Sequence, residues 1–248
     1  VENTYGDRNL LDLSVRKGGD LNKWINAKVN MLVGIDICQD GLINPENGAC
    51  VRILRTDLKL KETNNDMNIA DNYLIVWGDT SKDIDGKIDS DISDVCAMDE
   101  LNKYYLDIVY GNIDLQFIKN GKLRNFHNLG NTSVGNGFDI ISSQFSIHYY
   151  FKNETILNTF LNNISKSLKK GGRFVGTCLD GLSVFNALES EVSIQNEGPL
   201  CWKITKKYMN EEFNDIEPCL GYEIDVYHDS IGHSFTEYLV NMNYLIYI

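Results

Sequence analysis

The sequence predicts an α/β fold with a mostly parallel sheet, because short apolar runs alternate with segments of helical periodicity. A second observation is that polar residues follow the first four runs, as expected where parallel strands end at one edge of a sheet. A third is that the C-terminal part changes to short β-like pieces, which predict antiparallel edge strands. Of the 248 residues, 43% are hydrophobic, enough for a sizeable core, and we expect a single domain over residues 1–248.

The first part of the chain supplies the start of the predicted sheet. Three strands are predicted, at residues 9–14, 31–37 and 73–77. Apolar residues at helical spacing predict a helix over 20–29, with Asp20 as its cap. Residues 83–135 are acidic and rich in asparagine, with one helical patch at 95–110. We expect them to be a peripheral insertion.

The second part of the chain continues the alternation. A fourth strand is predicted at 138–145, followed by the stretch 146–151, which is too aromatic for an ordinary solvated loop. Apolar residues on one face predict a helix over 153–169 that ends at the glycine pair 171–172, and a fifth strand over 173–178. Further β-like pieces are predicted at 192–194, 201–205, 222–227 and 234–240.

Charge and cysteine content limit the class of protein. The 23 basic and 35 acidic residues give a net charge of −12, which argues against nonspecific nucleic-acid binding, so any RNA contact is expected to be local. The six cysteines form no C-x-x-C pair, so neither a zinc site nor a disulfide framework is indicated. No apolar run is long enough to span a membrane. We therefore expect a cytoplasmic protein without metal or membrane partner, cut from a longer chain.

A candidate ligand site lies where the first strand of the sheet gives way to a loop and a helix, at residues 10–21, because backbone amides at a helix start can face a polar ligand. Asp36 ends the second strand, where nucleoside sites commonly place an acid against ribose hydroxyls, although a helix N-cap is an equal alternative. Neither G-x-G-x-x-G nor a phosphate loop is present. An S-adenosyl cofactor, which has no phosphate to bind, fits better than a dinucleotide.

Each candidate side chain also has a simple structural interpretation. Residues 17–20 are typical of a solvated turn, and Asp79 of an Asx turn. Aromatic residues such as Tyr149 commonly pack in a core, and His148 alone would be a buried, hydrogen-bonded histidine. Glu237 alone would be an exposed charge on a strand.

Several stretches, taken together and in order, resemble one protein family. They are Leu11-Asp12-Leu13 with Lys17-Gly18-Gly19-Asp20-Leu21, Gly34-Ile35-Asp36-Ile37, Gly78-Asp79-Thr80-Ser81-Lys82, Phe138 to Tyr149, Leu168 to Thr177, and Thr236 to Val240. The chain resembles the mRNA cap guanine-N7 methyltransferases, and among them the methyltransferase domain of large-DNA-virus (African swine fever virus-like) mRNA capping enzymes. The Lys-Gly-Gly-Asp-Leu and Gln-Phe-x-x-His-Tyr elements in this order are the specific part.

The resemblance implies a Rossmann-like class I fold that uses S-adenosylmethionine. It implies cofactor-binding roles for Asp12, Ser14, Lys17, Gly18, Asp20, Asp36, Ile37, Asp79, Thr80, Gln144, Phe145 and Ser146. It implies cap-binding roles for Phe145, His148, Tyr149, Glu237, Lys17 and Arg52. No catalytic acid or base is expected, because guanine N7 carries a lone pair and the sulfonium is a strong methyl donor, so orientation supplies the rate.

Individual roles follow from the same resemblance. The loop from Asp12 to Asp20 is expected to meet the methionine part of the cofactor, Asp36 its ribose and Asp79 its adenine. Residues 144–146 are expected to line the methyl-transfer face. On the cap, Glu237 is expected at the Watson–Crick edge of guanine, beside Phe145, His148 and Tyr149, with Lys17 and Arg52 toward the phosphates.

The resemblance also implies partners and leaves other functions open. The implied partners are a capped RNA 5′ end and the other domains of a capping enzyme, at a viral replication site or in a virion if the protein is viral. The family usually has small residues where this chain has Ser14-Val15-Arg16. The alternatives are an S-adenosylmethionine-dependent methyltransferase for another substrate, and a noncatalytic module that binds cap or cofactor.

Overall fold

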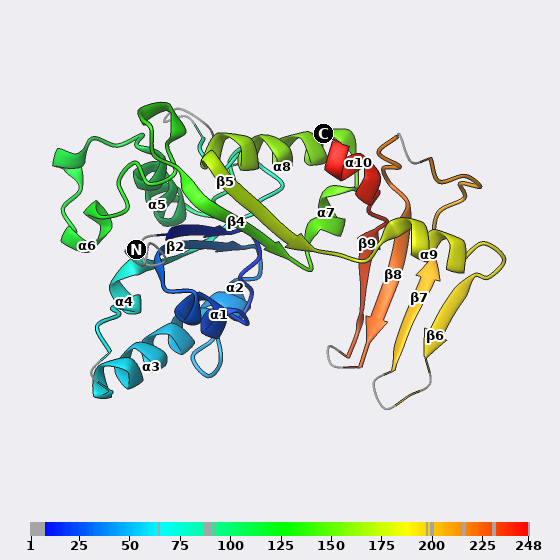
Figure 1. The fold of residues 1–248 in the computed structure, drawn as a ribbon, viewed down its shortest axis with the longest axis horizontal. Helices are drawn as coiled ribbons and strands as arrows, with labels where there is room; N and C mark the ends of the chain where they lie inside the picture. The colour runs from blue at the N-terminus through cyan, green and yellow to red at the C-terminus, as the bar shows by residue number, and fades with distance from the viewer. Residues whose placement is uncertain are drawn as a thin grey trace, which may run out of the picture. The chain divides into compact units, whose positions relative to one another are not determined.

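The fold is described by a computed structural model that covers residues 8–63, 65–86, 91, 93–196, 198, 201–214, 217–229 and 232–247. The chain divides into two compact units (Figure 1). Unit 1 comprises Val1–Ser143 and Thr159–Val175, and unit 2 comprises Gln144–Asn158 and Gly176–Ile248.

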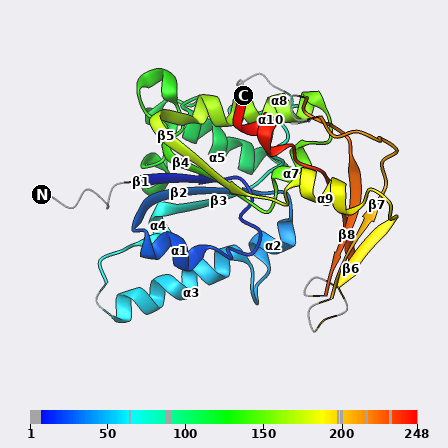
Figure 2. The same ribbon diagram turned by 45° about the vertical axis from the view of Figure 1, so that its right-hand side comes forward.

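A five-stranded sheet with the order β3-β2-β1-β4-β5 forms the centre of unit 1 (Figure 2). Its strands are β1 (Arg8–Asp12), β2 (Val29–Asp36), β3 (Tyr73–Trp77), β4 (Phe138–Gln144) and β5 (Leu168–Thr177). Strand β1 pairs in parallel with β2 and with β4, and β2 pairs in parallel with β3. The predicted mostly parallel sheet is confirmed, and each of the three N-terminal strands lies within two or three residues of its predicted bounds.

Helices cover both faces of this sheet. The helices in this part of the chain are α1 (Leu21–Asn26), α2 (Gln39–Ile43), α3 (Ala49–Glu62), α4 (Ile69–Asn72), α5 (Glu100–Tyr110), α6 (Gly121–Arg124) and α8 (Glu154–Ser167), with 3₁₀ turns at Leu115–Phe117 and Thr132–Val134. Helices α1 and α3 lie on one face, and α5 and α8 on the other (Figures 1 and 2). Among the described residues, no helix is long and apolar enough to cross a membrane.

On the face of the sheet that α1 and α3 cover, the core consists of the residues that helical and strand periodicity place on the inner side of each element. Trp24 of α1 packs edge-on against Tyr73 of β3, with ring centroids 6.1 Å apart. Leu32 of β2 and Ala49 and Ile53 of α3 belong to the same buried cluster. Full burial of such side chains stabilises the fold by about 1.5–3 kcal/mol each.

Residues 83–135 contribute buried side chains to unit 1. Ile84, Ile108 and Ile118 are almost inaccessible to solvent, and Phe126 is 2% exposed. Helix α5, which occupies most of the predicted helical patch, begins with an Asp99 side chain that caps the amide of Asn102.

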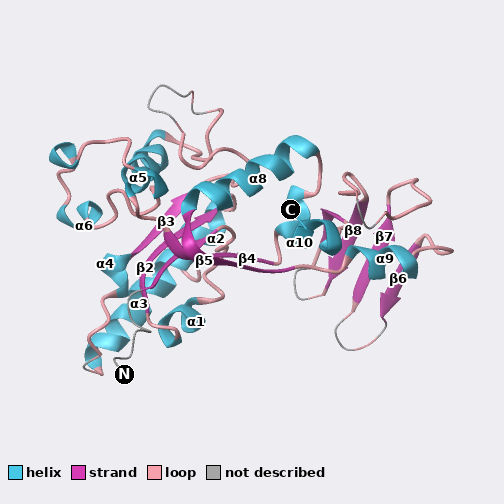
Figure 3. Ribbon diagram, turned by 45° about the horizontal axis from the view of Figure 1, so that its top comes forward, coloured by secondary structure: helices cyan, strands magenta, loops and turns pink. Residues whose placement is uncertain are grey.

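The C-terminal strands form a four-stranded antiparallel sheet in unit 2, with the order β6-β7-β8-β9 (Figure 1), and are drawn in magenta in Figure 3. They are β6 (Ser193–Asn196), β7 (Trp202–Lys206), β8 (Glu223–His228) and β9 (Ser234–Tyr238), with helices α7 (Ile147–Tyr150), α9 (Gly181–Ala187) and α10 (Met242–Tyr247). Their antiparallel pairing is confirmed, and they form a sheet of their own. Phe185 of α9 stacks on Tyr208 at 5.6 Å and packs with Ile204 and Ile224 of the sheet.

Two local features differ from the sequence prediction. Helix α3 was not predicted, because Leu54 and Leu58 point outward and obscure its apolar face. Helix α8 ends at Ser167, and β5 begins at Leu168 and runs through the glycine pair that was expected to end the helix. The second glycine, Gly172, allows close packing, since a Cβ there would lie 3.0 Å from the backbone oxygen of Asp139.

Candidate functional site

Carboxylates end the two central strands of unit 1. Asp12 is the last residue of β1 and pairs with Gly34, while Asp36 is the last residue of β2 and pairs with Trp77. Because β1, β2 and β3 are parallel, the loops that follow them lie at one edge of the sheet. The predicted convergence of polar residues at this edge is present within unit 1.

Asp12 is a buried carboxyl group, 2% exposed. Its Oδ1 accepts a hydrogen bond from the amide of Ser14 at 3.0 Å, and the hydroxyl of Ser142 also hydrogen-bonds to it. Burial raises the pKa of Asp12 to about 7, and the negative charges of Asp20 and Asp36 contribute to that rise.

Asp36 uses both carboxylate oxygens to hold backbone. Oδ2 accepts from the amide of Arg16 at 2.7 Å, and Oδ1 accepts from the amide of Cys38 at 2.8 Å. Burial raises the pKa of Asp36, and these two hydrogen bonds oppose the rise. Asp36 is not the N-cap of the following helix, which was the alternative. Cys38 occupies the N-cap position of α2, and its side chain makes no capping hydrogen bond. Asp36 instead joins the loop after β1 to the turn after β2.

Arg16 lies at the tip of the loop after β1 with a φ of 46°, in the left-handed region. Glycine adopts this conformation freely, whereas a residue with a Cβ is strained there. This accounts for the small residues expected at this turn. In this chain the hydrogen bond to Asp36 holds the strained amide.

The prediction that Asp20 caps the following helix is right about its position and wrong about its side chain. Asp20 occupies the N-cap position of α1, but its side chain makes no capping hydrogen bond. With φ at −93° and ψ at 5°, its backbone is not in the extended conformation that capping uses. The carboxylate pairs with Lys23 Nζ at 2.7 Å.

The side chain of Arg52 contacts the backbone of Lys17. Arg52 Nη1 on α3 donates to the backbone oxygen of Lys17 at 2.8 Å. Gly18 is buried beside them and has a φ of 66°.

The loop after β3 contains the Asx turn that was an alternative for Asp79. Asp79 Oδ1 accepts from the amide of Ser81 at 3.0 Å and from its hydroxyl at 2.6 Å. Thr80 Oγ1 donates to the backbone oxygen of Leu13 at 3.3 Å and so connects this loop to the end of β1. Ile37, directly after Asp36, leaves 58% of its surface exposed.

In unit 2 the backbone turns sharply at Phe145, which has a φ of 52°. Its amide donates to both the backbone oxygen and Oγ1 of Thr177, at 3.0 and 3.1 Å. Thr177 Oγ1 in turn donates to Gln144 Oε1 at 3.1 Å. The Phe145 side chain is 72% exposed, and Ser146, which follows it, is buried. Thr177 was not predicted as a site residue, although it is the polar end of β5.

Glu237 lies on the inward face of the antiparallel sheet. It pairs with Ile224, and the alternation of β9 puts it on the face that carries Phe235 and Leu239. Glu237 Oε1 lies 3.6 Å from His148 Nε2 of α7. The His148 ring lies 4.3 Å from the ring of Tyr149, which is 44% exposed. The interpretation of Glu237 as an exposed strand charge is therefore wrong.

Burial sets the charge of both groups. It raises the pKa of Glu237 to about 7 and lowers the pKa of His148 to about 4. His148 is thus neutral at pH 7, and 3.6 Å is too long for a hydrogen bond. Neither ring nitrogen of His148 has a hydrogen-bond partner among the described residues, so the hydrogen-bonded histidine expected from the sequence alone is not found. Buried polar atoms without partners cost free energy, which a polar ligand can recover.

The predicted site residues fall into two groups. Unit 1 holds Asp12, Ser14, Lys17, Gly18, Asp20, Asp36, Ile37, Arg52, Asp79 and Thr80, and unit 2 holds Gln144, Phe145, Ser146, His148, Tyr149 and Glu237. Within the part of the chain that the structure describes, no group of His, Cys, Asp and Glu is arranged to hold a metal ion.

Comparison with known proteins identifies relatives. The model of the mRNA (guanine-N(7))-methyltransferase domain family matches residues 74–248. A probable mRNA-capping enzyme of Acanthamoeba polyphaga mimivirus is 31% identical over 246 residues, which are 95% of this chain and 18% of that protein. An mRNA cap guanine-N(7) methyltransferase of Candida albicans is 26% identical over 171 residues, covering 67% of this chain and 27% of that protein. The chain thus spans about a fifth to a quarter of these relatives.

A solved structure is similar at a lower level. An S-adenosylmethionine-dependent methyltransferase from Clostridium acetobutylicum superposes with a TM-score of 0.46 and 11% identity, covering 96% of this chain and 69% of that chain.

Proposed function

The chain belongs to the mRNA (guanine-N(7))-methyltransferase domain family, and we propose that it transfers a methyl group from S-adenosylmethionine to N7 of an mRNA cap guanine. The observation that carries this proposal is the buried Glu237 carboxylate beside the unpartnered ring of His148. We further propose that residues 1–248 form one methyltransferase domain of a longer capping enzyme, with a capped RNA 5′ end as its substrate.

The residues of unit 1 fit the proposed cofactor. Its methionine part carries an ammonium and a sulfonium, and the carboxylates of Asp12, Asp20 and Asp36 offer negative charge to such groups. Each oxygen of Asp36 accepts one amide and keeps a second lone pair, which suits ribose hydroxyls. The exposed side chain of Ile37 offers an apolar surface to adenine, beside the polar turn at Asp79.

The residues of unit 2 fit a guanine base. Its N1–H and exocyclic amine are two donors on one edge, and an ionised Glu237 is an acceptor for both. Phe145 and Tyr149 present exposed aromatic surfaces that can stack on a purine. In unit 1, the positive charges of Lys17 and Arg52 suit the cap phosphates.

The reaction needs no general base in this proposal. Bound S-adenosylmethionine supplies an electrophilic methyl group to the N7 lone pair, and the sulfur retains the electrons of the broken S–CH₃ bond. Positive charge then develops on the purine. The Glu237 carboxylate stabilises this cationic purine more strongly than it stabilises neutral guanine. His148 is neutral at pH 7 and serves as a hydrogen-bonding and shape-determining group.

Methyl transfer to a short RNA with an unmethylated cap tests the proposal. The expected product is a cap methylated at guanine N7, with S-adenosylhomocysteine released. No transfer by a protein that binds S-adenosylhomocysteine would reject it, and methylation of an uncapped or small acceptor would instead support another substrate. A ligand at a hundred times its Kd adds about 2.7 kcal/mol of stability, so no thermal shift at any concentration would favour a noncatalytic module.

A further inference from the structure

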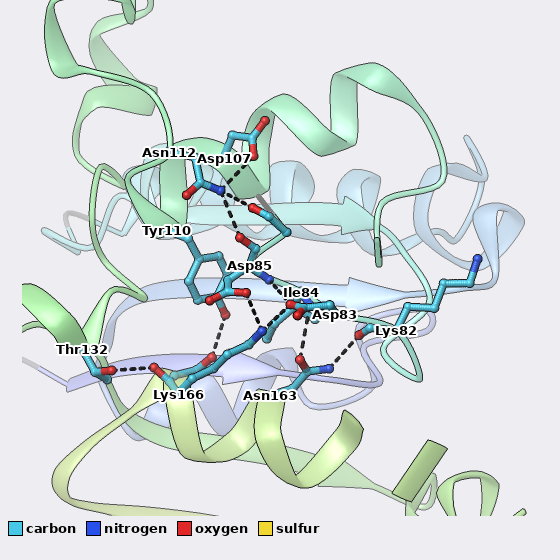
Figure 4. A network of polar contacts seen from close by, with 12 residues as sticks. Lys82, Asp83, Ile84, Asp85, Asp107, Tyr110, Asn112, Thr132, Asn163 and Lys166 are labelled. Atoms are coloured by element: carbon cyan, nitrogen blue, oxygen red, sulfur yellow. Dashed lines mark hydrogen bonds and ion pairs between the residues drawn. The ribbon is translucent and has the colours of Figure 1, made fainter. Parts of the chain in front are cut away.

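We propose that Asn163 is a positioning residue for the cofactor site of unit 1. It lies on α8, outside the residues that the sequence singles out, and holds the loop after β3 that carries Asp79 and Thr80. Figure 4 shows its side chain facing Lys82 and Ile84 of this loop. This inference rests on the proposed function, because it assigns Asn163 to the site where S-adenosylmethionine would bind.

Asn163 makes three hydrogen bonds to the backbone of this loop while being 1% exposed. Its Nδ2 donates to the backbone oxygens of Thr80 at 3.2 Å and Lys82 at 2.7 Å. Its Oδ1 accepts from the amide of Ile84 at 3.3 Å. The side-chain amide therefore uses both of its N–H donors and its oxygen to bind the backbone of three alternate residues of one loop.

Part of the loop is held by backbone contacts with residues 95–97. Among the described residues it makes two isolated bridges, Gly78 with Ala97 and Asp83 with Val95, and the amides of Asp79 and Cys96 donate to the backbone oxygens of Cys96 and Asp83 at 2.7 Å. Asn163 adds three hydrogen bonds to the backbone at the alternate positions 80, 82 and 84. Because buried backbone groups need partners, the loop conformation depends on this side chain.

The chemistry of the contact requires an asparagine. A side chain must both donate twice and accept once within a short reach, and among residues of this size only asparagine does so. Aspartate keeps the shape and the acceptor but loses both donors, whereas alanine loses all three bonds. These two substitutions separate the donors from the acceptor.

A second set of contacts holds the other end of the loop. Lys166, one turn further along α8, pairs with Asp83 and Asp85. From the opposite side, Asn112 Nδ2 donates to the backbone oxygens of Asp85 at 3.0 Å and Gly86 at 2.6 Å (Figure 4). Since these contacts bind residues 83–86, loss of Asn163 is expected to loosen mainly the backbone at Thr80 and Lys82, next to Asp79.

The test measures S-adenosylhomocysteine binding by titration calorimetry, with wild type, Asn163→Ala, Asn163→Asp and Asn162→Ala. Asn162 is exposed on the same helix and serves as the matched control. We expect Kd to rise about tenfold in both Asn163 variants, as for the loss of one or two net hydrogen bonds, with the binding stoichiometry unchanged. If Asn163 were needed only for folding, a fraction of each variant would be unfolded. The number of binding sites per chain would then fall, while the folded fraction would bind with the Kd of wild type. Asn163→Ser, which carries no charge and keeps one donor, carries the test if the other two variants fail to fold.

The outcomes distinguish this inference from the proposed function. Wild-type affinity in folded Asn163 variants, beside a wild type that binds, overturns the positioning role alone. A wild type that does not bind overturns the proposed function and this inference with it. In methyl transfer, the KM for S-adenosylmethionine is expected to rise while the KM for the cap stays unchanged, and an equal rise in both would also count against the positioning role.

Discussion

Glu237 and His148 approach to 3.6 Å between Oε1 and Nε2, yet they do not form an ion pair at neutral pH, because burial keeps His148 uncharged. Buried polar groups without hydrogen-bond partners cost free energy when no ligand is bound. Replacing one of the two is therefore expected to raise stability and to weaken recognition of the ligand.

The substitution Glu237→Gln is expected to abolish cap methylation and leave S-adenosylhomocysteine binding intact. The amide replaces an acceptor oxygen with a donor, which opposes the donors of guanine, so kcat/KM for capped RNA should fall at least about 100-fold. A radioactive methyl-transfer assay measures the loss, and titration of the cofactor product measures the retained site. Glu223→Gln is the matched control, because Glu223 pairs with Tyr238 and lies on the opposite face of the sheet. Full activity in Glu237→Gln would contradict the assigned role.

The same substitution is expected to stabilise the protein at high pH. Burial raises the pKa of Glu237 from 4.5 to about 7, so folding favours the protonated acid. The stability from this group is complete below pH 4.5 and is lost as pH rises through about 7. Glu237→Gln should therefore melt above wild type at pH 8, and thermal unfolding should show the gap closing by pH 4. A gap that does not change with pH would show that Glu237 has an ordinary pKa.

Cap affinity is expected to fall as pH decreases through about 7, because guanine donors prefer the ionised form of Glu237. Binding of a cap analogue, followed by fluorescence between pH 5.5 and 8.5, measures the profile. Glu237→Gln should bind weakly with a flat profile over that range, and a wild-type profile that is equally flat would speak against titration of Glu237.

Arg16→Gly is expected to be more stable than Arg16→Ala by about 1 kcal/mol. Both variants lose the same charged side chain, but only glycine adopts the φ of 46° without steric cost. Chemical denaturation of the two variants gives the difference directly. Equal stabilities would indicate that the loop relaxes to a negative φ once the arginine is removed.

Asp36→Asn is expected to weaken S-adenosylhomocysteine binding about tenfold and to lower stability by about 1–2 kcal/mol, since an amide nitrogen would face the backbone N–H of Arg16 or Cys38. Titration calorimetry and thermal unfolding give the two values. Asp40→Asn, an exposed neighbour on α2, should change neither. Unaltered affinity in Asp36→Asn would remove Asp36 from the site.

Local pattern was enough to predict the framework of unit 1. A buried parallel strand is a short apolar run bounded by polar residues. The sequence therefore predicts β2 and β3, and the position of Asp36 at the end of β2, from the order of apolar and polar residues alone. The periodicity of α8 and its start near Glu154 were equally accessible. Its end was not, because the glycine pair that usually stops a helix here belongs to a strand, where Gly172 packs closely on the backbone of Asp139 in β4.

The remaining features depend on contacts between distant residues. Glu237 is buried because alternation along β9 groups it with Phe235 and Leu239, a signal that the sequence carries but that a single charged residue masks. Asn163 looks like one of several asparagines on α8, and only its partners 79–83 positions away reveal a role. That the C-terminal strands form their own sheet likewise depends on pairing rather than on propensity.

The carboxyl groups of Asp12, Asp20 and Asp36 lie near enough to one another that the charges of Asp20 and Asp36 raise the pKa of Asp12. Methyl transfer would turn a positively charged sulfonium into a neutral thioether. The product keeps its ammonium group but has lost the sulfonium charge, so a negative region attracts it less strongly, and the spent molecule would be held less tightly than the fresh one. Under the proposed function, the side chains that draw the methyl donor in would thereby also limit inhibition by its product and help each turnover to end.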